Sequence, residues 1–337
     1  MGIDLNTIWF ILITILFTGF FFLEGFDYGV GILVPVIGKT DDEKRVILNT
    51  IGPHWDGNEV WMITAGGALF AAFPHVYATM FSGFYLALFC ILVALIVRAV
   101  GIDYRSKRAS ATWRKIWDIA IAISSILAAV LWGVAVGNLV TGVPIDENMQ
   151  YAGSFFTLLT PFTLLTGVMF GLLFLYHGAV FLQLKVGEEN LLDKINRLAP
   201  KLGVSMIVVT VIWVIFAFLT TGLFDKSINF FLCGLTAVTM ILSVFLGIKK
   251  KFGWSFLMIG LAIAFATFAV FISLFPNIMI STLDPSYSLT IYNASSSAYT
   301  LRLMTIIAFT LVPVVLAYQA WSFYIYRKRV TKETIHY

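Results

Sequence analysis

Residues 7–36 of the chain read TIWFILITILFTGFFFLEGFDYGVGILVPV, a run in which Glu24 and Asp27 are the only charged side chains. About 20 consecutive apolar residues in a helix are enough to cross the roughly 30 Å of hydrocarbon in a bilayer. The run therefore predicts a membrane-spanning helix. It is longer than the apolar part of a signal peptide and no basic residue precedes it, so we expect it to be retained rather than cleaved.

Eight further apolar runs follow the first one. They cover residues 57–73, 76–100, 116–139, 154–182, 202–223, 228–247, 254–275 and 301–325. The whole chain is 60% hydrophobic with a mean hydropathy of +0.92, and its 12% of charged residues is about half the roughly 25% typical of soluble domains. The sequence predicts an all-α polytopic membrane protein with nine transmembrane helices, and Pro74 is expected in the turn between the second and third helices.

Basic residues gather on one side of these runs, because twenty of the 22 Lys and Arg residues fall in alternate connections or in the tail. They are Lys39, Lys44, Arg45, Arg98, Arg105, Lys107, Arg108, Arg114, Lys115, Lys185, Lys194, Arg197, Lys201, Lys249, Lys250, Lys251, Arg327, Lys328, Arg329 and Lys332. By the positive-inside rule these segments are cytoplasmic, which predicts an external N-terminus and a cytoplasmic C-terminus. The basic residues flank the membrane without interleaved aromatic residues, so no nucleic-acid partner is expected.

The connections leave no room for a soluble domain, and the longer ones cover residues 38–56, 101–115, 183–201 and 276–300. The external segment 141–151 is the expected seam between two halves. Residues 1–140 are predicted to form a first four-helix bundle that carries the acidic clusters. Residues 141–337 are predicted to form a second four-helix bundle, one peripheral helix and the cytoplasmic tail.

Ionisable residues at membrane depth are costly, so each one is a candidate functional residue. Glu24 and Asp27 are three residues apart and share a helical face, while Gly25 and Gly29 would let another helix approach closely. Two interpretations stay open. The acids belong to a packing motif that Arg98 neutralises, or they handle protons.

A second polar cluster, GPHWDGNEVW at residues 52–61, combines His54, Asp56, Asn58 and Glu59 at the cytoplasmic start of the second predicted helix. Asp56 or Asn58 could cap that helix. Alternatively, the cluster forms a water-accessible acid and base at the mouth of a proton path. Both acidic clusters lie on the predicted cytoplasmic side, which favours proton uptake from that side.

A third polar group surrounds the connection after the predicted helix 76–100. It includes Arg98 and Asp118, for which lipid-headgroup anchoring and ion pairing are expected. The four histidines are dispersed, and His177 is predicted to be structural. Cys90 and Cys233 have no metal-binding spacing. We expect this chain to bind no metal or cofactor and to have no catalytic residue of its own.

Five segments in order resemble subunit II of the cytochrome bd-type quinol oxidases: EGFDYGVG at 24–31, PHWDGNEVW at 53–61, TAGGALFAA at 64–72, DYRSK at 103–107 and YNASSS at 292–297. The resemblance implies a bacterial cytoplasmic membrane protein in a heterodimer with subunit I. That partner would hold the b-type and d-type haems and the external quinol site, where quinol is oxidised and O2 is reduced to water. The resemblance leaves open a small single-helix third subunit. Membrane lipid would surround the complex.

Carried over to this chain, the resemblance places Asp56 on a proton route from the cytoplasm toward the haems and Trp61 near an apolar route for O2. Glu24 and Asp27 would belong to the proton route or support it structurally, and His54 is assigned to the route from its place in the second polar cluster. Glu59, where some relatives have Gln, is assigned to the same route, with Arg98, Asn58 and Asp118 as polar support. The alternatives are a proton-coupled secondary transporter or channel, which would need a matching site in the second half, and a purely structural assembly subunit.

Overall fold

The computed structural model describes residues 4–334, and helices account for most of them. They are α1 (Leu5–Ile37), α2 (Asp41–Ile51), α3 (Trp55–Ala72), α4 (Pro74–Gly83), α5 (Tyr85–Tyr104), α6 (Ala111–Thr141), α7 (Pro161–Lys185), α8 (Glu189–Thr220), α9 (Ser227–Ile248), α10 (Phe252–Leu274) and α11 (Ala298–Ile325). Two short antiparallel strands, β1 (Asn277–Met279) and β2 (Leu289–Thr290), lie in the connection before α11. The sequence analysis therefore predicted the helical character of the long apolar segments correctly, but it did not predict this small sheet.

Within residues 4–334, eight helices are long and apolar enough to cross a membrane. They are α1, α6, α7, α8, α9, α10, α11 and α5 with the short 3₁₀ turn (Arg105–Lys107) that follows it. The remaining predicted span, 57–73, forms α3, which is a helix of 18 residues but is not among these eight. Its first turns carry Asp56, Asn58 and Glu59, which lower its hydropathy.

The predicted helix 76–100 is wrong as a single element, because it is divided into α4 and α5 at Phe84. Gly83 ends α4 at a point where a Cβ atom would lie 2.7 Å from the ring of Tyr151, so the absence of a side chain at Gly83 lets that ring pack there. Pro74 does not lie in a turn but begins α4. Proline is tolerated at the first position of a helix because the missing N–H has no partner there.

Three other boundaries differ from the prediction. The connection 38–56 contains α2, which begins with a capping box between Thr40 and Glu43. The predicted span 154–182 begins instead at Pro161, after a short 3₁₀ turn and a cap from Thr160. Most of the predicted connection 183–201 belongs to α8, whose polar first turns extend beyond the apolar run that defined the span.

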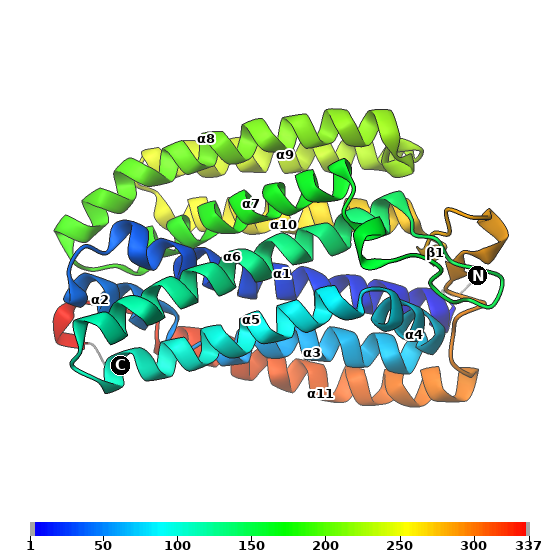
Figure 1. Cartoon of the computed structure of the whole chain (residues 1–337), viewed down its shortest axis with the longest axis horizontal. Coiled ribbons are helices and arrows are strands. Elements are labelled where there is room, and N and C mark those ends of the chain that lie inside the picture. The colour runs from blue at the N-terminus through cyan, green and yellow to red at the C-terminus, as the bar shows by residue number, and fades with distance from the viewer. Residues whose placement is uncertain (1–3, 335–337) are drawn as a thin grey trace.

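The helices run side by side along the long axis of the molecule, as Figure 1 shows. The connections after α1, α5, α7 and α9 lie at the same end as α2 and the C-terminal tail, whereas α4 and the strands lie at the other end. The predicted basic segments thus share one end of the bundle. Arg98 is the exception, because it is buried within α5 and is no surface topology determinant.

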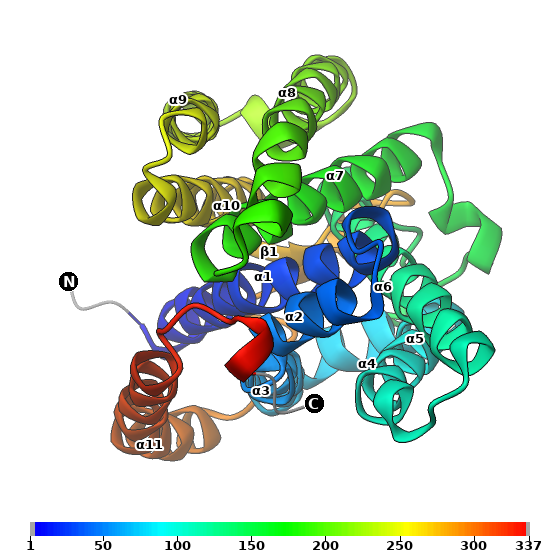
Figure 2. The same cartoon turned by 90° about the vertical axis from the view of Figure 1, so that its left-hand side faces the viewer.

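Helix α1 occupies the centre and contacts α3, α6, α7 and α10. Figure 2 shows α11 at one edge of the molecule and α8 and α9 at another. The main helix contacts of α11 are with α1 and α3, and Leu301 is its only residue classed as buried within the described chain.

Glycines on both helices allow α7 to approach α1 closely: Gly25 and Gly29 lie on α1, and Gly178 lies on α7. The spacing of Gly25 and Gly29 predicted this close approach. A Cβ atom at Gly29 would collide with the carbonyl oxygen of Phe174 and with Gly178 of α7. A Cβ atom at Gly25 would lie 2.6 Å from the ring of Phe174. The backbones touch where these side chains are missing, which is how small residues stabilise helix pairs in membranes.

We expect Gly29→Ala to separate α1 from α7 and to destabilise the protein by about 1–3 kcal/mol, the usual cost of overpacking. The measurement is the thermal unfolding midpoint of the purified protein in mild detergent. Gly234→Ala in α9 is the matched control, because no atom lies within 4 Å of a Cβ placed there. Equal midpoints for the two variants would contradict the close contact.

Candidate functional site

A buried ion pair joins α1 to α5. The guanidinium of Arg98 donates from Nη2 to Oε1 of Glu24, and their side chains are 1% and 0% exposed. The same Nη2 lies 3.4 Å from Oε2 of Glu59 on α3, whose side chain is 20% exposed. One cation therefore holds carboxylates from two helices, as the packing interpretation of Glu24 predicts.

Asp27 lies in the same region but is held by a different side chain. Asn58 of α3 donates from Nδ2 to Oδ2 of Asp27 at 2.8 Å, and the same nitrogen lies 3.4 Å from the carbonyl oxygen of Leu23. The side chain of Gln319 on α11 donates from Nε2 to Oδ1 of Asn58 at 3.0 Å. Asp27, Asn58 and Gln319 thus form a chain of hydrogen bonds from the peripheral helix to a fully buried carboxylate.

Gln319 was missed by the sequence analysis. It is the only amide side chain in the 28 residues of α11. A polar residue inside an apolar span was the signal that could have identified it.

The carboxylates outnumber the guanidinium at this site. Glu24, Asp27 and Glu59 surround Arg98, and charges buried in a medium of low dielectric must be paired or neutralised. Interacting carboxylates of this kind take up and release protons as a group. The arrangement can therefore store a proton while its salt bridge stays in place.

A groove of about 280 Å³ between α3 and α5 leads to this cluster from the surface. Asp56 and Glu59 line it together with Trp55, Val60, Ile63, Leu92, Leu95, Ile96 and Ala99. Asp56 is exposed, and its Oδ1 accepts the N–H of Gly57 at 2.8 Å. The N-cap of α3 is His54 and no side-chain capping bond is present there in the described chain, so the interpretation of Asp56 or Asn58 as a cap is wrong.

His54 is 3% exposed and packs against the last turns of α11. Its ring stacks on Phe323 at a centroid distance of 4.2 Å, and Nδ1 lies 3.4 Å from Oγ of Ser322. Burial, helped by the positive charge of Lys185, lowers the pKa of His54 from 6.5 to about 4. The imidazole is consequently neutral at pH 7 and anchors α11.

Trp61 is half-buried, and its indole packs on α1 where Gly19 has no side chain. A Cβ atom at Gly19 would lie 2.5 Å from Cε3 of the Trp61 indole, so the indole rests directly on the backbone of α1. This contact fixes the indole close to the acidic end of α3.

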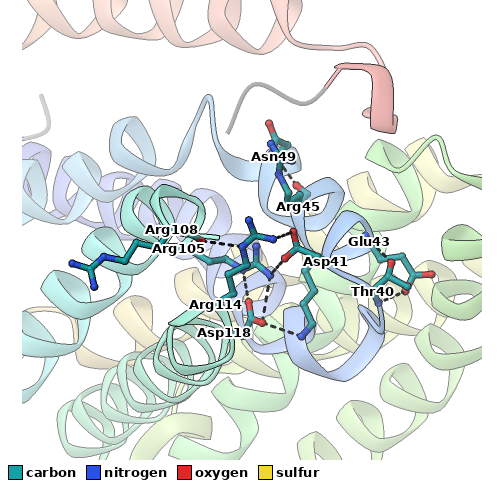
Figure 3. Close-up of polar contacts among 10 residues, drawn as sticks. Thr40, Asp41, Glu43, Arg45, Asn49, Arg105, Arg108, Arg114 and Asp118 are labelled. Atoms are coloured by element: carbon teal, nitrogen blue, oxygen red, sulfur yellow. Dashed lines mark hydrogen bonds and ion pairs between the residues drawn. The ribbon is translucent and has the colours of Figure 1, made fainter. Parts of the chain in front are cut away.

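Asp118 does not join the buried cluster and belongs instead to an ion-pair network at the end of the bundle (Figure 3). It accepts from Nε of Arg105 at 2.5 Å and from Nζ of Lys44 at 2.9 Å. Arg105 also reaches Oδ1 of Asp41 at 2.8 Å, while Nη1 of Arg114 reaches Oδ2 of the same residue at 2.7 Å. The network attaches α2 to α6 and to the segment after α5.

His177 is fully buried and its surroundings are filled by aromatic side chains. The rings of Phe22, Phe26 and Phe256 lie 5.2–5.6 Å from its ring centroid. In the part of the chain that the structure describes, no group of three or more His, Cys, Asp or Glu residues is placed to hold a metal ion. His177 thus occupies a packed position.

Comparison with known proteins gives consistent matches along nearly the whole chain. Residues 5–326 match the family described as cytochrome bd terminal oxidase subunit II. The chain is 40% identical to cytochrome bd ubiquinol oxidase subunit 2 of Bacillus subtilis (strain 168), with 99% of each sequence covered. It is 38% identical to cytochrome bd-I ubiquinol oxidase subunit 2 of Escherichia coli (strain K12), with 98% of this chain and 96% of the relative covered.

The fold has a counterpart among solved structures. A chain of the bd oxidase from Geobacillus thermodenitrificans superposes with a TM-score of 0.74 at 19% identity. The alignment covers 96% of this chain and 99% of the other. The arrangement of the helices is therefore shared at a low level of sequence identity.

Removal of one partner of the buried ion pair should be costly. We expect Arg98→Met to leave Glu24 uncompensated and to destabilise the protein by about 3–5 kcal/mol, measured as a lower unfolding midpoint and a lower yield of folded protein in detergent. The double variant Arg98→Met with Glu24→Gln should recover most of this loss, and Arg108→Met should behave like the native chain. A double variant as unstable as the single one would refute the pairing.

His54 should make the docking of α11 sensitive to pH. Between about pH 4 and 6.5, the His54 imidazole binds a proton more readily when α11 is undocked than when α11 is docked. Docking of α11 is therefore unaffected above pH 6.5 and weakens as the pH falls through this range. We expect hydrogen exchange at residues 322–330, corrected for its intrinsic pH dependence, to be faster at pH 5 than at pH 7.5 by about an order of magnitude. His54→Phe keeps an aromatic ring without a titrating group and should abolish the difference; its persistence would mean that another group is responsible.

Proposed function

Because the chain belongs to the cytochrome bd terminal oxidase subunit II family, we propose that it acts as that subunit in a quinol oxidase of the bacterial cytoplasmic membrane. Its relatives are named as subunits of ubiquinol oxidases, which makes an oxidoreductase complex the best-supported setting. The family assignment favours this role over a proton-coupled transporter or channel.

In the proposed complex a partner subunit I oxidises quinol and carries the b-type and d-type haems that supply electrons for the four-electron reduction of O2 to water. Each electron that reaches O2 must be matched by one proton. The residues of this chain serve proton delivery and support, and catalysis at O2 belongs to the partner. A small single-helix subunit and membrane lipid would complete the assembly.

The proposed topology has nine membrane-crossing helices, with α3 as the additional one. Two arguments support an odd number: the connections with most Lys and Arg residues share one end of the bundle, and the tail lies at that end (Figure 1). The N-terminus would be external and the C-terminus cytoplasmic. We propose residues 1–140 and 141–337 as the two halves, each with a four-helix bundle. Helix α11 belongs to the second half in sequence but packs against α1 and α3 of the first.

The proton route is proposed to begin at Asp56 and to continue through Glu59 to the buried cluster of Arg98, Glu24 and Asp27. One observation carries this proposal: Glu59 lines the surface groove and also lies 3.4 Å from the buried guanidinium. Glu59 therefore joins the exposed acid Asp56, which lines the same groove, to the buried cluster. His54, neutral at pH 7, supports the route by fixing α11, with Asn58 and Asp118 as further polar support.

The proposed O2 route passes Trp61. Trp61 does not line the groove between α3 and α5, but its neighbours Val60 and Ile63 on α3 do, and they are 51% and 64% exposed in this chain. Such a surface suits an apolar gas that arrives from the bilayer. This part of the proposal depends on the position of the indole against Gly19 rather than on a hydrogen bond.

Asp56→Asn tests the proton route and distinguishes it from a purely structural subunit. In the intact complex we expect quinol oxidase turnover to fall by roughly tenfold or more, because an amide cannot carry the proton. Assembly and the haem spectrum should be unchanged. Turnover is measured as O2 consumption across a range of pH.

Asp42→Asn is the matched control, since Asp42 is an exposed acid at the same end of the bundle whose only ion pair in the described chain is with Lys332. It should leave turnover at the native level. Native turnover in Asp56→Asn would instead favour the structural interpretation.

A further inference from the structure

We propose that Gln319 of the peripheral helix α11 is a positioning residue, which orients the Asn58 amide so that its NH2 group faces the buried carboxylate of Asp27. The inference deepens the proposed function, on which it rests for the role of Asp27 in proton delivery. It gives α11, the helix with the fewest buried residues among the eight spans, a part in the chemistry of the site.

The orientation of the Asn58 amide follows from its neighbours on one side. Nδ2 lies 2.8 Å from Oδ2 of Asp27 and 3.4 Å from the carbonyl oxygen of Leu23. A carbonyl and an ionised carboxylate only accept hydrogen bonds. When Asp27 is ionised, Asn58 must therefore present its NH2 group there, which leaves Oδ1 on the other side in need of a donor.

Gln319 supplies that donor. Its Nε2 lies 3.0 Å from Oδ1 of Asn58, which is 0% exposed and has no access to water as an alternative partner. A buried carbonyl without a donor costs about 1–3 kcal/mol. Without Gln319, Asn58 could recover this energy by turning Oδ1 toward Asp27, provided that Asp27 carried a proton to donate.

The depth of α11 is set by other contacts, so Gln319 is presented to Asn58 in a fixed register. At one end, Nε1 of Trp9 donates to the carbonyl oxygen of Leu301 at 3.1 Å and to Oγ1 of Thr305 at 3.0 Å. At the other end, His54 stacks on Phe323. Beyond α11, the tail is attached to the end of α7, where the N–H of Val330 donates to the carbonyl oxygen of Lys185 at 2.7 Å.

The charged groups around Asp27 come from three helices: Glu24 from α1, Glu59 from α3 and Arg98 from α5. They remain in place when Gln319 is replaced. A change in the proton occupancy of Asp27 in a Gln319 variant would therefore have two possible causes. One is a changed orientation of the Asn58 amide, and the other is the charge of the new side chain at position 319.

Three substitutions separate these contributions. Gln319→Glu is isosteric but accepts where glutamine donates, and it adds a negative charge. Gln319→Met removes the donor without adding charge. Gln319→Lys keeps a donor and adds a positive charge.

The test is an infrared titration of protonated carboxyl groups in the intact complex, with isotope-labelled aspartate and with an Asp27→Asn sample subtracted. We expect the midpoint for Asp27 to move to higher pH in Gln319→Met and further in Gln319→Glu, by about one pH unit. In Gln319→Lys it should stay at or below the native midpoint. Tyr318→Phe, at a 63% exposed neighbour on the same helix, should leave it unchanged.

A purely electrostatic or structural role gives different results. If charge alone acted, Gln319→Met would titrate like the native complex. If Gln319 only stabilised packing, both Met and Glu variants would assemble poorly without a shifted midpoint. Either result would overturn the inference. A third test uses the double variant Asn58→Leu with Gln319→Met: because the effect of Gln319 must pass through Asn58, an Asp27 midpoint that differs from that of Asn58→Leu alone would also overturn it.

The same variants distinguish a failure of the proposed role of Gln319 from a failure of the proposed proton route. A shifted midpoint with an unchanged pH profile of turnover supports the role of Gln319 and removes Asp27 from the proton route. An unshifted midpoint together with low turnover in Asp56→Asn keeps the proton route and overturns the role of Gln319.

Discussion

The architecture of the site depends on one guanidinium that is buried among apolar helices. A charge in hydrocarbon must be paired, and Arg98 meets this requirement with Glu24 of α1 and, at 3.4 Å, Glu59 of α3. Three helices are thereby held in a defined rotation about their axes. The same requirement leaves Asp27, which lacks a direct bond to Arg98, dependent on the amide of Asn58.

The two polar clusters perform different tasks. The network of Arg105, Asp41, Asp118 and Arg114 lies at the end of the bundle and attaches the short helix α2 (Figure 3). The cluster around Arg98 lies inside the bundle and has more carboxylates than cations. In the first network Lys44, Arg105 and Arg114 outnumber the two carboxylates of Asp41 and Asp118, so both carboxylates are paired. The second network has surplus carboxylates and can change its protonation without losing its main ion pair.

Sequence reasoning recovered what depends on composition and local spacing. The apolar runs identified α9, α10 and α11 to within a few residues, and the spacing of Gly25 and Gly29 identified the contact with α7. The end of α4 at Phe84 was not predicted, and the ring that packs on Gly83 beside it belongs to Tyr151, which lies far away in the sequence. Gln319 was also missed. A lone amide inside an apolar span was a visible signal, but its partner Asn58 is 261 residues away, so the contact itself could not be read from the sequence.

The long separation between α3 and α11 has a consequence for biogenesis. Asn58 is translated with α3, but Gln319 lies 261 residues further along the chain and cannot meet it until that stretch has been made. At 5–20 residues per second this takes roughly 13–52 s. During that interval the carbonyl of Asn58 is without the donor that Gln319 supplies in the folded chain. Docking of α11 is then the step that completes this chain of buried hydrogen bonds, so the site is assembled only after nearly the whole protein has been made.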